Sequence, residues 1–288
     1  MKKTTCWWIV AIILTYPALA LTAPEFVRES KSIFAHPHDI EIDPTGRWLF
    51  VADTNNHNIK VLDATTLEQH AVIGEGELNA PHDVHFDDVG RLLVADSGND
   101  RVVIYQLKGL KASLDFTISE HMESPEGVTS SPDGHIFVAS TGSHKILKFF
   151  QNRLVKETGR RGDDQLEFVR PHDIERGPDG LLYIGDPGNR RIQILTEDLM
   201  YHSQMSDRNK PYNEPKYLAL DKENLLYLAD QQNNLLRIYD EGRKQLHAIA
   251  VAGTKPLNYP EGVEVDGARL WISDTYNNRI VLFNRVRR

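Results

Sequence analysis

The chain has 288 residues, a formal charge of −8, 40% hydrophobic residues and a single cysteine. This composition is typical of a globular protein with a large core, and it argues against disordered, collagenous and disulfide-stapled chains. The acidic excess disfavours binding to nucleic acid or anionic lipid, because phosphate groups need clustered cations. Since Cys6 lies near the N-terminus, a cysteine nucleophile or zinc–cysteine cluster is excluded from the body of the chain.

Residues 1–20 have the order of a secretory signal. Two lysines precede the apolar run from Trp7 to Leu14, and Ala18-Leu19-Ala20 supplies the small residues at which we expect cleavage. The apolar run is shorter than the roughly 20 residues that cross a bilayer. The sequence therefore predicts an exported protein, periplasmic or extracellular, without stable membrane insertion after cleavage, and residues 21–288 form one predicted domain.

After the signal, one sequence unit recurs six times. Each copy opens with a proline followed two residues later by an aspartate, glycine or tyrosine and then by an aliphatic residue; the prolines are Pro37, Pro81, Pro125, Pro171, Pro215 and Pro260. A second β-rich block such as Phe50–Asp53 follows, then a polar turn and a third block such as Ile59–Leu62. Fourth runs such as Gln69–Ile73 lie between the copies. Four strands per copy predict an antiparallel blade.

One such blade cannot bury both of its faces, so six are expected to stack around an axis as an all-β, six-bladed β-propeller. The chain ends at Arg288, just after the third strand of the last copy, which leaves that blade without an outer strand. The segment Phe26–Phe34 offers a spare strand. We predict that it pairs beside the C-terminal strand and closes the ring, covering an edge that would otherwise invite aggregation.

Two segments carry a family resemblance, Asp96-Ser97-Gly98-Asn99-Asp100-Arg101-Val102 and Asp274-Thr275-Tyr276-Asn277-Asn278-Arg279-Ile280. With the blocks that precede them, they resemble the NHL repeat, and the resemblance extends over the six copies. It implies a six-bladed propeller, a fold that serves very different functions.

In propellers of this family, the residue after each opening proline lies near one mouth of the central channel. The resemblance therefore implies a ligand-binding ring at that mouth, made of His38, His82, Glu126, His172, Lys216 and Glu261. Alternate blades divide the ring into two sets of three. One set, His82, His172 and Glu261, combines two imidazoles with a carboxylate and could bind zinc, iron or manganese. The alternative is a solvated ring without a metal ion.

The Pro-His-Asp-Ile/Val motifs are similar to those of peptidyl-α-hydroxyglycine α-amidating lyases, in which histidines of alternate blades hold a zinc ion at the channel. His82 and His172 match two of those positions, whereas Glu261 stands at the third. Calcium, which a lactonase on a related propeller requires, matches this ring poorly because it prefers acidic and amide ligands.

Other acidic residues have structural interpretations. A strand-end aspartate recurs in five copies and is expected to accept hydrogen bonds from the turn that follows it; these residues are Asp53, Asp96, Asp186, Asp230 and Asp274. Asp39, Asp83 and Asp173, which follow the ring histidines, are expected to orient neighbouring groups.

These observations predict a module that binds a small molecule, peptide or protein on the face around the channel mouth. The alternative is an enzyme, a metal-dependent lyase or hydrolase in which an ion at His82, His172 and Glu261 polarises substrate or activates water. No Gly-x-Ser-x-Gly elbow supports a serine hydrolase. The polar stretch from Ser203 to Pro215 is expected to form a loop that contributes to a ligand rim.

Overall fold

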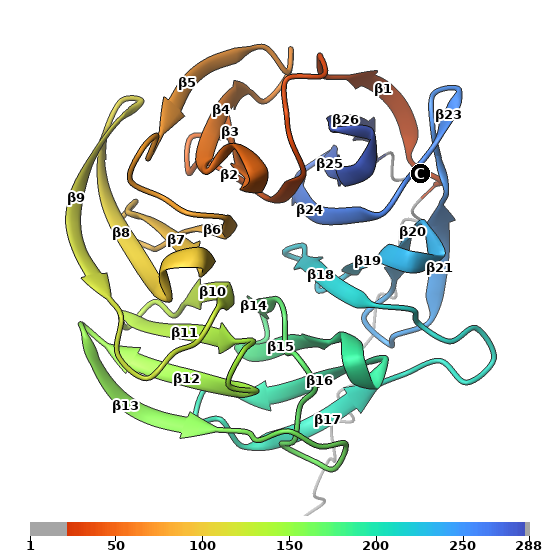
Figure 1. Ribbon diagram of the computed structural model, residues 1–288. Helices are drawn as coiled ribbons and strands as arrows, with labels where there is room; N and C mark the ends of the chain where they lie inside the picture. The colour runs from red at the N-terminus through yellow and green to blue at the C-terminus, as the bar shows by residue number, and fades with distance from the viewer. Residues whose placement is uncertain (1–21, 286–288) are drawn as a thin grey trace, which may run out of the picture.

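The structure is a computed structural model that describes residues 22–285, so the predicted signal at residues 1–20 lies outside the described residues. Within 22–285, no helix is long and apolar enough to cross a membrane. Six four-stranded antiparallel sheets surround a central axis as a six-bladed β-propeller, which confirms the predicted fold (Figure 1).

Within each blade, the strands follow one another outwards from the axis. Blades one to three are β2 (Pro37–Ile42), β3 (Trp48–Asp53), β4 (Asn58–Asp63) and β5 (Gln69–Ile73); β6 (Pro81–Phe86), β7 (Leu92–Asp96), β8 (Arg101–Lys108) and β9 (Lys111–Ile118); and β10 (Pro125–Ser130), β11 (His135–Ser140), β12 (Lys145–Phe150) and β13 (Arg153–Thr158).

Blades four to six are β14 (Ile174–Arg176), β15 (Leu181–Asp186), β16 (Arg191–Thr196) and β17 (Tyr201–Met205); β18 (Pro215–Leu220), β19 (Leu226–Asp230), β20 (Leu235–Tyr239) and β21 (Gln245–Ile249); and β24 (Pro260–Asp266), β25 (Arg269–Asp274), β26 (Arg279–Asn284) and β1 (Glu25–Glu29). A small hairpin of β22 (Val251–Ala252) and β23 (Lys255–Pro256) lies between the last two blades in sequence.

The blades are held together by apolar side chains from facing sheets. Between blades one and two, for example, Phe50 and Ile59 pack with Val84 and Val94 in one buried cluster. The middle strands are buried because each blade lies between two neighbours, whereas an outer strand such as β21 alternates in exposure. This difference explains why the sequences of the middle strands are continuous apolar runs.

Ring closure by the N-terminal strand is confirmed. β1 pairs antiparallel with β26, and its register places Glu25 opposite Asn284. The closing strand is shorter than predicted, since β1 ends at Glu29 and Phe34 instead enters the core between blades one and six. Glu29 also forms an ion pair with Arg279 of β26, so the closing strand is held by charge as well as by backbone hydrogen bonds.

The strand-end aspartates have the predicted structural role. One oxygen of each accepts the backbone N–H of the loop that precedes the same blade, at 2.6–2.8 Å, as in Asp53 with Ala35 and Asp96 with Asn79. The other oxygen accepts the amide of the asparagine three residues on, such as Asn99, and a cation such as Arg101. Each aspartate therefore ties a short 3-10 turn to its own blade; these turns are η1 (Thr54–Asn56), η2 (Ser97–Asn99), η3 (Pro187–Asn189), η4 (Gln231–Asn233) and η5 (Thr275–Asn277).

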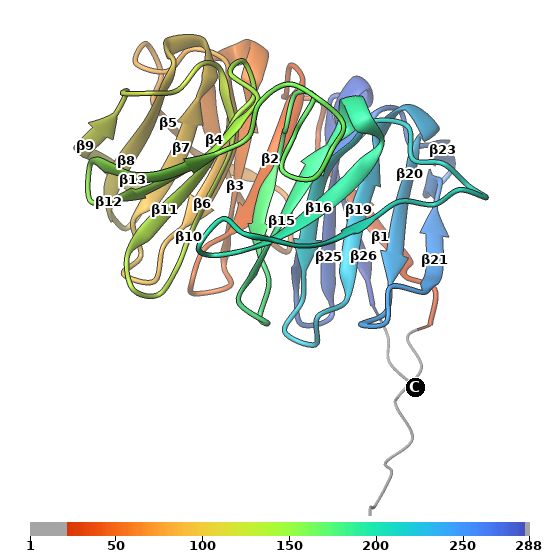
Figure 2. The same cartoon turned by 90° about the horizontal axis from the view of Figure 1, so that it is seen from below.

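The 3-10 turns lie along one face of the disc, shown uppermost in Figure 2, and we call this the mouth face. At most junctions between blades, the residue that ends the turn after a blade's second strand accepts a hydrogen bond through its side chain. The donor is the backbone N–H of the residue before the next opening proline. Asn278 Oδ1, for example, accepts the His36 N–H at 3.0 Å. Equivalent bonds are made by His57, Asp100, His144 and Asn234.

The junction from blade four to blade five differs from the others. There the linking position is Arg190, whose side chain is only a donor, and within 22–285 no side chain accepts the Glu214 N–H. A second link is also missing, because Pro187 stands where Thr54, Ser97, Thr141 and Thr275 donate a hydroxyl to the next opening proline. This junction is therefore less strongly hydrogen-bonded on the mouth face.

Candidate functional site at the channel mouth

The structure brings the six predicted ring residues together at the channel mouth. Contacts between their side chains join them into two groups, each centred on a glutamate. We call these the Glu126 group, formed by His82, Glu126 and His172 of blades two to four, and the Glu261 group, formed by Lys216, Glu261 and His38 of blades five, six and one.

In the Glu126 group, the carboxylate bridges the two flanking blades. Glu126 Oε2 lies 3.1 Å from His172 Nε2, and Oε1 lies 3.8 Å from His82 Nε2. His82 Nδ1 is 2.9 Å from the Ala80 carbonyl oxygen, which can only accept, so the proton of a neutral His82 ring sits on Nδ1. His82 Nε2 is then left as an acceptor.

The Glu261 group repeats this plan with one cation. Glu261 Oε1 lies 3.2 Å from Lys216 Nζ, and Oε2 lies 3.1 Å from His38 Nε2. The Gln231 amide also donates to Oε1. The His38 and His82 rings, 4.5 Å apart between centroids and edge to face, join the two groups.

The contacts therefore run mainly between neighbouring blades, whereas the sequence grouped alternate blades. His82 and His172 lie together, with ring centroids 6.1 Å apart, but within residues 22–285 no hydrogen bond or ion pair joins Glu261 to either of them. In the same residues, no group of three or more His, Cys, Asp or Glu side chains is arranged to hold a metal ion. Metal binding by His82, His172 and Glu261 stays a prediction.

Burial shifts the protonation of the ring. It lowers the pKa of His38 and His172 well below the usual value, and nearby cationic groups lower both further. It also lowers the pKa of His82 and raises the pKa of Glu261 to about 7, although Lys216 opposes the second shift. The ring thus presents neutral imidazoles, and Glu261 can exchange a proton near neutral pH.

Tyr217 forms the floor of this ring. It is fully buried, and its hydroxyl reaches from blade five across the channel to donate to the His82 carbonyl at 2.8 Å. Its ring lies edge to face with His172, at 4.8 Å between centroids. Burial raises the pKa of Tyr217 well above its usual value, so the phenol stays protonated and keeps this bond.

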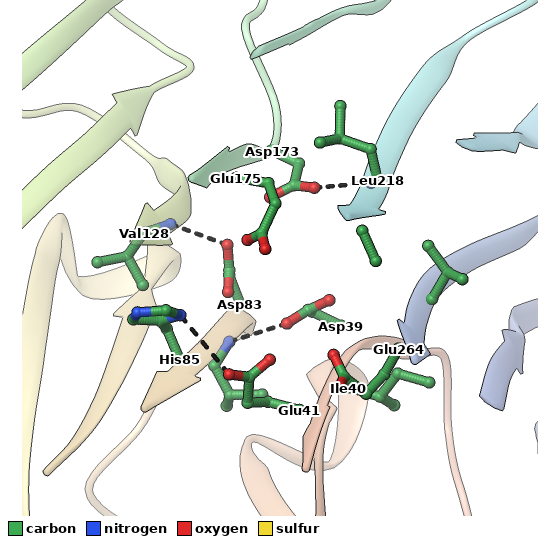
Figure 3. A pocket seen from close by; sticks show the side chains of 13 residues that line it. Asp39, Ile40, Glu41, Asp83, His85, Val128, Asp173, Glu175, Leu218 and Glu264 are labelled. Carbon is green, nitrogen blue, oxygen red and sulfur yellow. Dashed lines mark hydrogen bonds and ion pairs between the residues drawn. The ribbon is translucent and has the colours of Figure 1, made fainter. Parts of the chain in front are cut away.

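Further along the channel, six carboxyl groups meet around a cavity of about 20 Å³, enough for about one water molecule (Figure 3). We call it the acidic chamber; it is formed by Asp39, Glu41, Asp83, Asp173, Glu175 and Glu264. Burial raises the pKa of all six.

The three aspartates of the acidic chamber also connect the blades. Each accepts a backbone N–H from the next blade, as Asp83 does from Val128 at 2.8 Å and Asp173 from Leu218 at 2.7 Å. These bonds tie the innermost strands that carry the ring to one another.

Three buried polar atoms of the ring have no hydrogen-bond partner within the described chain: His38 Nδ1, His172 Nδ1 and Glu261 Oε2. Glu261 Oε2 is close to His38 but not in hydrogen-bond geometry with it. Because an unsatisfied buried polar atom costs about 1–3 kcal/mol, such a cluster indicates a place where water, an ion or a ligand is needed.

Comparison with known proteins supports the resemblance inferred from the motifs. A probable peptidyl-α-hydroxyglycine α-amidating lyase of Caenorhabditis elegans is 23% identical over 239 residues, which cover 80% of this chain and 57% of that protein. NHL repeat-containing protein 3 of Mus musculus is 27% identical over 177 residues, 56% of this chain and 49% of that protein. The resemblance to NHL-repeat and amidating-lyase proteins is confirmed.

The chain spans about half the length of these curated relatives. No family model matches it. Among solved structures, a streptogramin B lyase superposes with a TM-score of 0.65 at 12% identity, covering 94% of this chain and 87% of that one. An auxiliary nutrient binding protein from Bacteroides thetaiotaomicron gives a TM-score of 0.69 at 13% identity, covering 88% of this chain and 69% of that one. At such identities the likeness shows the shared fold alone.

Two parts of the site were not predicted from the sequence. Tyr217 lies in the most divergent opening segment, Pro215-Lys216-Tyr217-Leu218, where the pattern gave no reason to expect a side chain across the channel. Glu41, Glu175 and Glu264 were not singled out either. Their shared signal is visible in retrospect, because each lies four residues after an opening proline.

Proposed function

We propose that the channel mouth binds a small polar ligand and that this binding is the protein's function. The proposal is carried by the three unpartnered polar atoms of the ring, which belong to His38, His172 and Glu261. A ligand that bonds to them would remove the cost of leaving them unsatisfied.

The ring residues fall into two sets, one more exposed and one more deeply buried. His82, Glu126 and Lys216 have side chains 16–19% exposed and would meet an incoming ligand first. His38, His172 and Glu261 are 3–10% exposed and line the deeper part above Tyr217. A small polar molecule suits this depth better than a folded partner, while a peptide could enter by its end.

The experiment is a thermal-shift and calorimetric screen of hydroxy acids, amines and short peptides against the purified protein. Lys216→Met and Glu261→Gln should each weaken binding of any hit about tenfold, as expected for loss of one charge-assisted hydrogen bond. Lys244→Met, on an exposed turn, is the matched control and should bind as wild type. A hit that binds equally to all four proteins does not use the ring, and this result would contradict the proposal.

A second candidate, a metal-dependent lyase, is favoured by the donor chemistry. Two of the three predicted ligands, His172 and Glu261, carry an unpartnered buried atom, and neutral imidazole with carboxylate suits zinc, iron or manganese. His82, His172 and Glu261 would hold the ion, which would polarise a substrate or activate water. Lys216, whose Nζ lies 3.2 Å from Glu261 Oε1, would add a cation that holds an anionic group of the substrate.

Elemental analysis of the purified protein tests this candidate. A stoichiometric transition metal that is lost in the His82→Ala/His172→Ala double variant supports it, and turnover of a peptidyl-α-hydroxyglycine would assign the activity named for the nematode relative. Protein that stays metal-free after incubation with zinc, iron and manganese, yet binds its ligand, contradicts it and leaves the binding function standing.

We also propose that the protein is exported and acts in the periplasm or outside the cell. The support is the order of charged, apolar and small residues in 1–20. Fractionation of expressing cells should place the protein outside the cytoplasm, with a mature N-terminus at residue 21. Retention in the cytoplasm with Met1 intact would contradict export.

A further inference from the structure

A second pocket lies at the rim, away from the channel. It has a volume of about 480 Å³ and lies between the outer parts of blades four and five. Its walls are the end of β17, the loop 206–214 and the residues around the β20–β21 turn. We call it the rim pocket, and its polar lining includes Gln204, Asp207, Arg208, Tyr212, Tyr239 and Gln245.

One buried polar group of the rim pocket is the Tyr239 hydroxyl. Tyr239 is only 3% exposed, and its hydroxyl has no hydrogen-bond partner within the described chain. Burial, followed by the neighbouring Tyr212 hydroxyl, raises the pKa of Tyr239, so the phenol remains a donor. A buried hydroxyl that lines a pocket without a partner is available to a ligand.

The repeat provides an internal comparison for this hydroxyl. Tyr105 occupies the same position in blade two, 24 residues after the opening proline in each case. Its hydroxyl donates to Glu77 Oε2 at 3.2 Å. In blade five the position equivalent to Glu77 is Pro211, which cannot accept through its side chain. Blade five has therefore lost the carboxylate that accepts this hydroxyl in blade two, and the neighbouring Tyr212 hydroxyl does not reach hydrogen-bond geometry with Tyr239.

Two side-chain amides add donors to the same pocket. The Gln204 oxygen accepts from Arg191 at 3.2 Å, and the Gln245 oxygen accepts from Arg237 at 3.3 Å. Since arginine can only donate, these contacts fix each amide with its oxygen on the arginine. The NH₂ groups of Gln204 and Gln245 have no partner within residues 22–285 and are left to donate elsewhere.

The charges of the rim pocket also favour a ligand that accepts hydrogen bonds. Arg208 is exposed and makes no ion pair in the described part of the chain. Arg243 adds a second cation; its guanidinium stacks on Tyr183 and already donates to Asn224 and to the Tyr183 hydroxyl, so it contributes charge. The one acid, Asp207, already accepts the backbone N–H groups of Asn209 and Lys210 through Oδ1. The groups free to bind are thus mainly donors, and the arginines outnumber the acid.

From this arrangement we propose that the rim pocket is a binding site for a small carboxylate anion. The carboxylate would accept from the Tyr239 hydroxyl and the NH₂ groups of Gln204 and Gln245, with Arg208 supplying charge at the entrance. This site is separate from the channel mouth and does not depend on the function proposed there.

The test is a calorimetric titration with succinate, made in the Lys216→Met background so that binding at the ring is weakened. Saturable binding at millimolar concentration is expected. Tyr239→Phe, which removes one oxygen atom, should weaken it about tenfold or more, as expected for a hydrogen bond to a charged group. Tyr105→Phe makes the same change at the equivalent position of blade two and should leave the affinity unchanged.

Two further titrations define the ligand class. Glucose offers neutral hydroxyls and putrescine offers only cations, and neither should bind to the rim pocket. The proposal is overturned if succinate shows no saturable binding, if Tyr239→Phe and Tyr105→Phe bind it equally, or if glucose competes as well as succinate does. Because Tyr→Phe at residue 239 removes an unsatisfied hydroxyl, the variant should fold, and its melting temperature checks this.

Discussion

The Glu126 group and the Glu261 group occupy opposite halves of the ring and share one plan. In each, a glutamate from a Pro-Glu-Gly-Val segment extends one oxygen towards each neighbouring blade. The glycine after the glutamate is required in both: a Cβ at Gly127 or Gly262 would lie 2.4 Å from a backbone oxygen of the next blade. The scaffold of the two halves is thus the same.

Their difference lies in one pair of residues. Blade two has His82-Asp83 where blade five has Lys216-Tyr217. The exchange puts a cation beside Glu261, and it replaces a carboxylate that bonds to the next blade with a phenol that crosses the channel. A nearly symmetric scaffold therefore carries an asymmetric site, in which the two carboxylates have different partners.

The largest expected effect comes from removing Tyr217, which connects the two halves through its bond to the His82 carbonyl. Tyr217→Ala would leave a cavity on the axis and an unpaired His82 carbonyl, so it should lower the free energy of unfolding by about 3–5 kcal/mol. Tyr217→Phe keeps the ring and loses only the hydrogen bond, which should cost about 1 kcal/mol. Urea denaturation measures both. Similar losses for the two variants would show that Tyr217 does not fill the channel.

The next effect is a pH dependence of stability that comes from Glu261. The ordinary carboxyl pKa is 4.5, and burial raises that of Glu261 to about 7, so the folded state binds the extra proton. Below about pH 4.5 both the folded and the unfolded state carry the proton, and Glu261 does not reduce the free energy of unfolding. As the pH rises towards 7, the unfolded state releases the proton more readily, and the free energy of unfolding falls. Glu261→Gln cannot titrate, so it should gain about 2 kcal/mol relative to wild type between pH 5 and 7.

Melting curves at a series of pH values measure this difference. Glu126→Gln makes the same chemical change in the other half and is the matched control. If Glu126→Gln and Glu261→Gln shift in parallel with pH, the two carboxylates are equivalent and the asymmetry described above is wrong.

The smallest effect concerns the boundary between the halves at blades four and five. Arg190 has φ of +55°, a conformation that asparagine tolerates well, as Asn234 and Asn278 show at the same position. Arg190→Asn should supply the missing acceptor for the Glu214 N–H and raise the free energy of unfolding by about 1 kcal/mol. Asn234→Ala, which removes such a link one junction later, should lower it by about the same amount. No gain from Arg190→Asn would mean that solvent already satisfies the Glu214 N–H.

The fold was predictable because repetition reveals it without any knowledge of distant contacts. Six prolines with similar spacing placed the innermost strands, and the missing outer strand of blade six identified the closing segment. The membership of the ring came from the family resemblance, which implies that the residue after each opening proline lies near the channel mouth.

The pairing inside the ring could not be predicted in the same way. Six-fold symmetry placed His82, His172 and Glu261 in one set because they belong to alternate blades. Which side chains touch depends instead on their length and charge. Lys216 is long enough and charged to contact Glu261 in the adjacent blade, while Glu126 lies between two histidines. Tyr217 was missed for a related reason, because a side chain that spans the channel has its partner, the His82 carbonyl, 135 residues away.

The closing strand has a consequence for how the protein is made. Of the strands in residues 22–285, β1 is synthesised first and its partner β26 last, and the Glu29–Arg279 ion pair joins residues 250 positions apart. During translation blade one can therefore form early, whereas blade six is complete only when β26 has been made and pairs with β1. Until β1 and β26 pair, the blades on either side of the gap expose apolar faces. We therefore expect a chaperone or a protease to act on the propeller before it closes.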